Sequence, residues 1–229
     1  MASSTTPTLQ VCRECGAGAP LDAHFCPQCT KILPLGRQGD YFAFLGVPRR
    51  LNLDPAELER RFRDLSRQFH PDYFYNATPA ERRASLERSS FLNDAYRTLK
   101  NQVTRIEYLL EIEGLGLRSP QEASKAVPPA LLEEVFALNE ELDEIREQRS
   151  GGAPETEWRP RLERARAPIE TRRSDHEAQL GELSARWDAL PDGAPPAARR
   201  DVLQALRERI LERNYINNLL GGIERELHS

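Results

Sequence analysis

Apolar residues recur at helical spacing along most of the chain, and this pattern predicts an all-α protein. From Leu58 to Phe69, four apolar residues follow one another at intervals of four, three and four, which places them on one face of a helix. Asp54-Pro55 predicts where this helix begins, and Glu57 is placed to close a capping box with the aspartate. Pro71 ends the helix, because proline lacks the backbone N–H that a helix interior requires.

A second helix is predicted directly after the loop that Pro71 opens. It begins at Thr78-Pro79-Ala80-Glu81, which has the sequence of a capping box. The side chains that we expect to point inward from it are Leu86, Leu92, Ala95, Tyr96 and Leu99. Together the two helices would form an antiparallel hairpin with His70 and Asp72 at its tip.

Three further helices are predicted in the C-terminal part of the chain, where apolar stripes are separated by turns rich in Gly and Pro. The packed face of the first is expected to consist of Leu131, Val135, Leu138, Leu142 and Ile145. A turn at residues 150–154 leads into a long Arg/Glu-rich helix that ends near Leu190. The last helix follows the prolines between 191 and 196, and its apolar residues are Val202, Leu206, Ile210, Leu219 and Ile223. Three amphipathic helices joined by short turns predict a small antiparallel bundle.

All four cysteines of the chain form two C-x-x-C pairs, Cys12/Cys15 and Cys26/Cys29, separated by ten residues. Two such pairs can complete a closed tetrahedron of thiolates, so the spacing favours a structural zinc site. Disulfides and an Fe–S cluster are the alternatives, and His24 could replace one cysteine as a ligand. Four bound thiolates leave no open coordination position. We therefore expect the metal to stabilise a segment too short for its own core rather than to support catalysis.

These patterns divide the chain into six parts. They are a flexible tail at 1–9, a four-cysteine zinc module at 10–33, a linker at 34–39, a helical-hairpin domain at 40–115, a second linker at 116–128 and the three-helix bundle at 129–229.

The composition narrows the class of function. The 229 residues have a formal net charge of -4 at pH 7, which argues against general nucleic-acid binding. Apolar stretches stay well short of the roughly 20 residues that a membrane span needs. Met1–Gln10 has neither the basic and apolar regions of a secretion signal nor the Arg-rich pattern of an import signal. We therefore expect a cytoplasmic protein.

Several stretches of the hairpin domain resemble a J-domain. They are Tyr41-Phe42-x-x-Leu45-Gly46, Phe62-Arg63-x-Leu65-Ser66-x-Gln68-Phe69-His70-Pro71-Asp72 and Leu92-Asn93-Asp94-Ala95-Tyr96-Arg97-Thr98-Leu99. Beyond it, Arg105–Leu110 and then Leu138–Ile145 resemble HscB-type co-chaperones of Fe–S cluster assembly, the second stretch being similar to their scaffold-binding helix. The four-cysteine module is similar to the one in the longer, metal-binding members of that family.

The resemblance implies that the chain is not an enzyme but docks on a DnaK/HscA-type chaperone ATPase and accelerates its hydrolysis of ATP. The chaperone-binding residues that it implies are His70, Pro71 and Asp72, with Arg60, Arg61, Arg63 and Arg67 supplying electrostatic attraction. In this interpretation Asp72 makes a charge-assisted contact, Pro71 fixes its direction and His70 orients the loop. Tyr73 stands where many J-domains have lysine. A helix C-cap with a turn is the alternative for the tripeptide, and a solvated face is the alternative for the arginines.

The same resemblance implies that the bundle captures an IscU-type Fe–S scaffold through exposed apolar side chains rimmed by acids. Matched by motif, the apolar positions are Leu132, Phe136 and Tyr215, and the acidic positions are Glu140 and Glu144. Glu133 and Ala137 depart from the family's pattern. Ordinary core packing is the alternative for the apolar residues, and a solvated face is the alternative for the acids. The sequence leaves a homodimer possible.

Three rival functions follow from the same features. A general J-domain protein would recruit unfolded clients through a broad apolar or Met-rich surface, whereas this chain has a single methionine. A metalloenzyme is disfavoured because both cysteine pairs are used and His176 and His228 lack ligand spacing. A zinc-ribbon nucleic-acid binder conflicts with the negative net charge.

Overall fold

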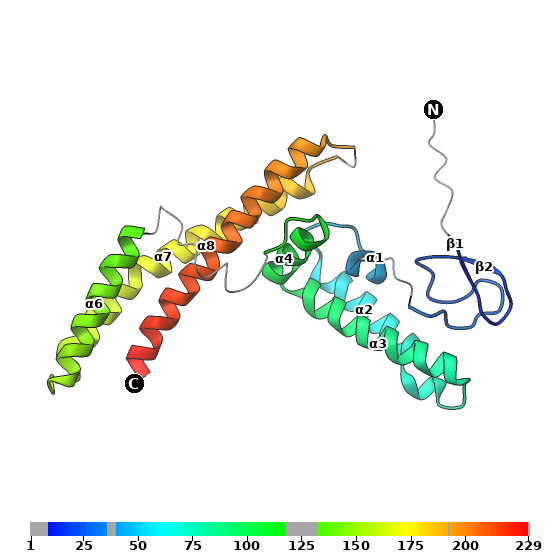
Figure 1. Ribbon diagram of the computed structural model, residues 1–229, viewed down its shortest axis with the longest axis horizontal. Coiled ribbons are helices and arrows are strands. Elements are labelled where there is room, and N and C mark those ends of the chain that lie inside the picture. The colour runs from blue at the N-terminus through cyan, green and yellow to red at the C-terminus, as the bar shows by residue number, and fades with distance from the viewer. Residues whose placement is uncertain (1–8, 36–39, 118–131, 192, 229) are drawn as a thin grey trace. The chain divides into compact units, whose positions relative to one another are not determined.

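The protein is described by a computed structural model in which residues 9–35, 40–117, 132–191 and 193–228 are placed, the side chains of 132–134 excepted. It forms two compact units, Met1–Arg105 and Ile106–Ser229. Helices dominate both units, and the described sheet has two short strands (Figure 1). The predicted all-α class is confirmed.

The cysteine-containing segment of the first unit is built on turns rather than helices. Strand β1 (Leu9–Val11) pairs antiparallel with β2 (Gly18–Pro20), with Val11 opposite Gly18. An isolated bridge between Phe25 and Ile32 closes the second cysteine loop in the same way. The small core of this segment consists of Cys12, Ala19, Cys26 and Leu33. Half of that core is cysteine, so the segment has little apolar packing of its own.

The hairpin domain contains α1 (Tyr41–Leu45), α2 (Pro55–Phe69), the 3-10 helix η1 (Pro71–Phe74) and α3 (Pro79–Lys100). The predicted N-caps are confirmed: the Asp54 carboxylate accepts from the backbone N–H of Ala56, and Thr78 makes a full capping box with Glu81. The capping box expected at the first helix is replaced by ion pairs, because the Glu57 carboxylate binds Arg60 and Arg61 one turn away.

The inward face of α3 departs from the predicted one at Leu86. Leu86 is 58% exposed, so its predicted inward placement is wrong. It lies six residues before the buried Leu92, or about 1.7 turns, and therefore points to another side of the helix. The buried row instead consists of Ala84, Arg88, Leu92, Ala95 and Leu99. An arginine thus occupies an interior position of the hairpin.

Helix α4 (Gln102–Ile112) crosses from the first compact unit into the second. The compact division lies between Arg105 and Ile106, whereas the sequence predicted a boundary at 115/116. One continuous helix serves both units, so the chain changes unit without a linker at that point. Residues 118–128 of the predicted second linker lie outside the described residues.

The second unit contains α6 (Leu132–Ser150), α7 (Glu155–Asp188) and α8 (Pro196–His228), the three helices predicted for the bundle. The long helices α7 and α8 lie side by side, and α6 packs against both (Figure 1). Their shared core consists of Leu138, Leu142, Ile145, Trp158, Leu162, Ile169, Ile216, Leu220 and Ile223. The predicted apolar stripe of α6 is therefore a packed face. Its first member, Leu131, lies outside the described residues.

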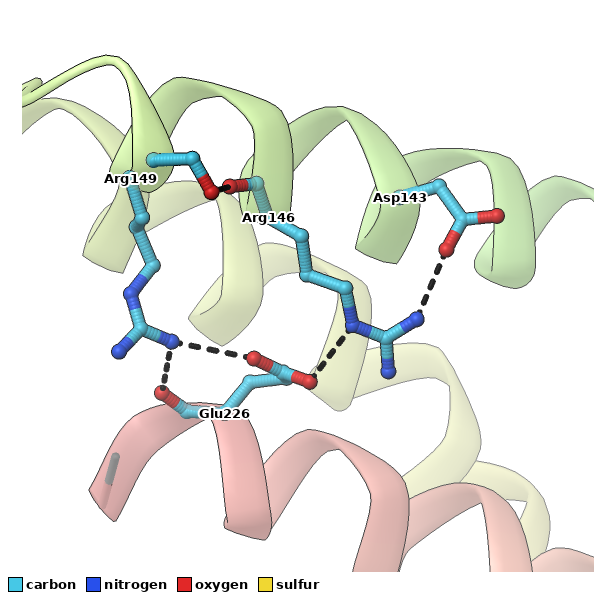
Figure 2. A network of polar contacts seen from close by, with 5 residues as sticks. Asp143, Arg146, Arg149 and Glu226 are labelled. Atoms are coloured by element: carbon cyan, nitrogen blue, oxygen red, sulfur yellow. Dashed lines mark hydrogen bonds and ion pairs between the residues drawn. The ribbon is translucent and has the colours of Figure 1, made fainter.

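Charged side chains join the end of α6 to the end of α8 (Figure 2). The Glu226 carboxylate accepts from Arg146 Nε at 2.8 Å and from Arg149 Nη1 at 3.0 Å. Arg146 also binds Asp143 at 2.7 Å, and the Arg149 guanidinium lies 4.7 Å from the centre of the Trp158 ring. Two arginines from one helix thus share a carboxylate of another, which fixes the pairing of α6 with α8 at this end.

Among the described helices, none is both long and apolar enough to cross a membrane.

We expect Leu162→Ala to lower the free energy of unfolding of the bundle by about 2–5 kcal/mol, because this leucine is fully buried between α6, α7 and α8. Urea unfolding followed by circular dichroism measures the change. The neighbouring Glu163, whose side chain is 62% exposed, supplies the control: Glu163→Ala should alter stability by about 0.5 kcal/mol or less. Equal effects of the two substitutions would contradict the core that we describe.

Candidate functional site

The His70-Pro71-Asp72 loop lies where α2 ends and η1 begins. Phe69 is the last residue of α2, and His70 adopts an extended conformation, as expected for a residue that precedes proline. The Nδ1 atom of His70 accepts a hydrogen bond from the backbone N–H of Asp72 at 3.3 Å. In the neutral imidazole the proton must therefore sit on Nε2. The loop is a small hydrogen-bonded turn rather than a loose connection.

The carboxylate of this loop is presented to solvent. The Asp72 side chain is 86% exposed, and its Oδ2 atom lies 3.5 Å from His70 Nδ1. Two exposed aromatic rings flank it, Tyr73 and Tyr75, and the Tyr73 ring meets the His70 ring edge-on at 6.1 Å. Sequence reasoning noted Tyr73 but missed Tyr75. The sequence offered one signal for Tyr75: it is an aromatic residue in a turn too short to bury its ring.

The four arginines of α2 are exposed, as predicted, but they are not free charges. Each is paired within the helix: Arg60 and Arg61 with Glu57, Arg63 with Glu59, and Arg67 with Asp64. Four arginines against three acids give α2 a net charge of only +1. Exposed pairs of this kind contribute about 0.3–0.5 kcal/mol each and exchange readily with other partners. The basic exterior that the sequence predicted is therefore a mixed face with a small positive excess.

The four cysteine sulfurs converge, as the C-x-x-C spacing predicted. All four Sγ atoms lie within 4.8 Å of one another, with 3.7 Å between Cys12 and Cys29 and 3.6 Å between Cys15 and Cys26. A tetrahedral ion with metal–sulfur bonds of about 2.3 Å requires sulfur–sulfur distances near 3.8 Å. The same distances are far too long for disulfide bonds of about 2.05 Å. The donor set therefore fits one tetrahedral metal ion.

The backbone of the two cysteine loops explains this convergence. The backbone N–H of Gly16 donates to the carbonyl of Cys12, and that of Thr30 donates to the carbonyl of Cys26 in the same relative position. Both residues that follow the second cysteine of a pair have a positive φ, 73° at Gly16 and 57° at Thr30. The two loops are thus near-copies of one turn, each wrapping two sulfurs around the same point.

The neighbouring groups shift the pKa values of the thiols of Cys26 and Cys29 in opposite directions. The backbone N–H groups of Cys29 and Gln28 lower the pKa of Cys26 to about 7. At Cys29 the N–H of Lys31 lowers the pKa, but desolvation and the neighbouring thiols outweigh it and raise the pKa to about 12. Four thiolates in so small a space repel one another, and a divalent cation removes that repulsion.

His24 is not a ligand in this arrangement, because both of its nitrogens are engaged elsewhere. Its Nδ1 lies 2.7 Å from Arg88 Nη1, and its Nε2 lies 3.2 Å from the carbonyl oxygen of Phe44. Burial, and then the charge of Arg88, lower the pKa of His24 to about 4, so the imidazole is neutral at pH 7. The alternative in which His24 replaces a cysteine is therefore not supported by the geometry.

The residues predicted to bind a scaffold differ in their exposure. Phe136 is 65% exposed on α6, and Glu140 is exposed one turn further along the same helix. Glu144 is also exposed, and its carboxylate accepts from Arg161 Nη2 at 2.6 Å. Tyr215 is only 9% exposed and packs with Val135 in a small core of its own. The side chain of Leu132 lies outside the described residues.

The burial of Tyr215 corrects the expectation that it offers an apolar surface. Its ring lies between α6 and α8, where desolvation raises the pKa of its hydroxyl. A residue enclosed in this way packs between the two helices and offers little surface. Of the predicted apolar positions whose side chains are described, Phe136 alone is exposed.

Comparisons with known proteins agree with these motifs. The family model of the DnaJ domain matches residues 40–108. The crystal structure of human co-chaperone protein HscB is similar to this chain with a TM-score of 0.68 and 24% identity, over 95% of this chain and 98% of that one. The chaperone HscB from Vibrio cholerae is similar with a TM-score of 0.60 and 25% identity, over 82% of this chain and 98% of that one.

We expect the protein to carry one metal ion per chain and the double variant Cys26→Ser, Cys29→Ser to carry none, because it loses half of the four-sulfur donor set. Elemental analysis after dialysis measures the stoichiometry. His24→Gln is the matched control and should keep its metal, since the imidazole is bonded to Arg88 and Phe44. Loss of metal from the control with retention by the double variant would show a different ligand set.

Proposed function

Because residues 40–108 are a DnaJ domain in a chain with the fold of HscB co-chaperones, we propose that this protein is a co-chaperone of iron–sulfur cluster assembly. Its DnaJ domain binds a DnaK/HscA-type chaperone and stimulates that partner's hydrolysis of ATP. Its bundle delivers an IscU-type scaffold protein to the same chaperone. The observation that carries the proposal is the His70-Pro71-Asp72 turn, exposed at the junction of α2 and η1 inside the matched domain.

The loop has the properties of a docking element. Its ends are fixed by α2 and α3, and its one carboxylate is 86% exposed, so a partner arginine could bind Asp72 with little ordering cost. His70 supports this geometry by accepting from the Asp72 N–H. The small positive excess of α2 adds long-range attraction to an acidic surface, and its arginines can exchange their intrahelical partners for acids of the chaperone.

Phe136 is the basis for placing the scaffold on the bundle. A large exposed apolar side chain beside the acidic Glu140 resembles an interface anchor with a charged rim. A protein that binds chaperone and scaffold at once raises the effective concentration of each for the other. The chaperone is thus stimulated to hydrolyse ATP while its client is already nearby.

We further propose that zinc occupies the four-cysteine module. A closed set of four thiolates in two C-x-x-C turns suits its tetrahedral preference and leaves no position for a substrate. A reducing compartment such as the cytoplasm suits four metal-binding thiols. The metal then stabilises a segment whose apolar core is too small to fold alone.

Asp72→Asn should reduce ATPase stimulation to the chaperone's basal rate, because the amide lacks the charge that the proposed contact requires. Steady-state ATP hydrolysis by a DnaK/HscA-type chaperone measures the effect. Asp94→Asn, at an exposed aspartate paired with Arg97 on α3, is the matched control and should stimulate normally. Normal stimulation by Asp72→Asn would contradict the proposed chaperone site.

Phe136→Ala should weaken binding of an IscU-type scaffold by about 1–3 kcal/mol while leaving stimulation without scaffold unchanged, because the ring lies in the bundle and not in the DnaJ domain. Isothermal titration calorimetry gives the affinity. Tyr75→Ala removes an equally exposed ring from the other unit and should leave scaffold affinity as it is. If unfolded polypeptides stimulate turnover as well as the scaffold does, the protein serves general clients instead.

A further inference from the structure

We propose that the four-cysteine module positions the His70-Pro71-Asp72 loop, so that metal occupancy of the module is transmitted to the chaperone-binding site. The inference rests on the proposed function of that loop. Both elements belong to the first compact unit, and their contacts run through a buried arginine, Arg88, a half-buried histidine, His24, and one buried ring, Phe69. None of these three residues is a metal ligand or part of the exposed loop.

Arg88 of α3 is the centre of this connection. It is only 2% exposed, and its hydrogen-bond partners all belong to residues 23–34. Its guanidinium donates to Leu33 O at 2.8 Å, Pro34 O at 3.1 Å, Ala23 O at 3.4 Å and His24 Nδ1 at 2.7 Å. These acceptors are uncharged, and burial lowers the pKa of Arg88 to about 10, so it still carries its charge at pH 7. The interior of the hairpin thus holds a cation whose described hydrogen-bond acceptors are backbone carbonyls and one imidazole of residues 23–34.

His24 extends the connection to a third element. Because arginine can only donate, the Nδ1 atom of His24 must accept from Arg88, and Nε2 then carries the proton that is donated to Phe44 O at 3.2 Å. One imidazole therefore links α3 to the end of α1. It sits two residues before Cys26, so its position depends on the second cysteine loop.

Phe69 connects this cluster to the chaperone-binding loop. Its ring is fully buried, 5.0 Å from the His24 ring and 5.9 Å from the Phe25 ring, both of the module, and 5.6 Å from the Arg88 guanidinium. Its carbonyl oxygen accepts from the hydroxyls of Ser85 at 2.6 Å and Ser89 at 3.0 Å. The next residue in the chain is His70. The module therefore packs on the residue from which the loop departs.

A second contact lies on the far side of the loop. Lys31, between the last cysteine and the linker, binds the Glu81 carboxylate at 2.9 Å. That carboxylate also closes the capping box of Thr78, where α3 starts after the loop. The module thus holds both chain segments that bracket η1, Phe69 before it and Glu81 after it.

Metal binding controls these contacts because the module cannot hold its shape by apolar packing. Two of the four residues in its core are the ligands Cys12 and Cys26. When the thiols lose their cation, the turn that carries His24 and Phe25 loses its support. The module then no longer packs on Arg88 and Phe69, and the loop loses a fixed contact on each side.

Hydrogen exchange on the full-length protein tests the coupling without an activity assay. We expect removal of zinc with EDTA to accelerate amide exchange at least tenfold in residues 70–82, while amides in the middle of α7 keep their rate. Arg88→Met should give the same acceleration with one zinc still bound. Arg83→Met, at an exposed arginine on the same helix, is the control and should change nothing. Unchanged exchange in 70–82 in both the zinc-free protein and Arg88→Met would overturn the proposal.

Chaperone kinetics separate positioning from a general loss of structure. Arg88→Met should raise the concentration that gives half-maximal ATPase stimulation several-fold and leave the maximal stimulated rate unchanged, because Asp72 itself remains. If Arg88→Met does not fold, Lys31→Met keeps the buried cluster and should still accelerate exchange around Thr78 by severalfold. Should Asp72→Asn stimulate normally while Arg88→Met still alters exchange, the proposed function fails and the coupling stands. If Asp72→Asn abolishes stimulation while Arg88→Met leaves exchange unchanged, the coupling fails and the proposed function stands.

Discussion

The buried charge of Arg88 is the constraint on which the first unit depends. A guanidinium inside a hairpin of apolar residues is tolerated only if every donor finds an acceptor, since an unpaired buried charge costs several kcal/mol. The acceptors come from backbone carbonyls and an imidazole of residues 23–34, the segment that carries Cys26 and Cys29. The module and the hairpin therefore share buried contacts, although their sequences look like separate parts joined by a linker.

The second unit is arranged on a different principle. Its long helices share a continuous apolar core, and ion pairs such as those of Glu226 fix the pairing of their ends. Phe136 lies on the surface of α6, outside this core, and is 65% exposed. The proposed chaperone loop and the proposed scaffold surface thus lie in different compact units. The proposed adaptor role requires this separation, because each site must work while the other is occupied.

Local sequence signals were sufficient wherever one element decides its own structure. The caps at Asp54 and Thr78, the break at Pro71 and the two cysteine turns follow from short-range sterics and hydrogen bonding. The same local signals failed where two kinds of partner compete for one side chain. Glu57 was placed to close a capping box, yet its carboxylate pairs with Arg60 and Arg61 of the next turn instead.

Spacing along the chain was enough to predict the helical class, the J-domain motif at His70-Pro71-Asp72 and the four candidate metal ligands. Which residues share the interior follows only from how the elements pack. Arg88 was not among the residues predicted to face inward from α3, and its partners lie more than 50 residues away. Tyr215 matched a surface motif, but α8 packs it against Val135 of α6. Burial and long-range pairing depend on all elements at once, so no local pattern could have revealed them.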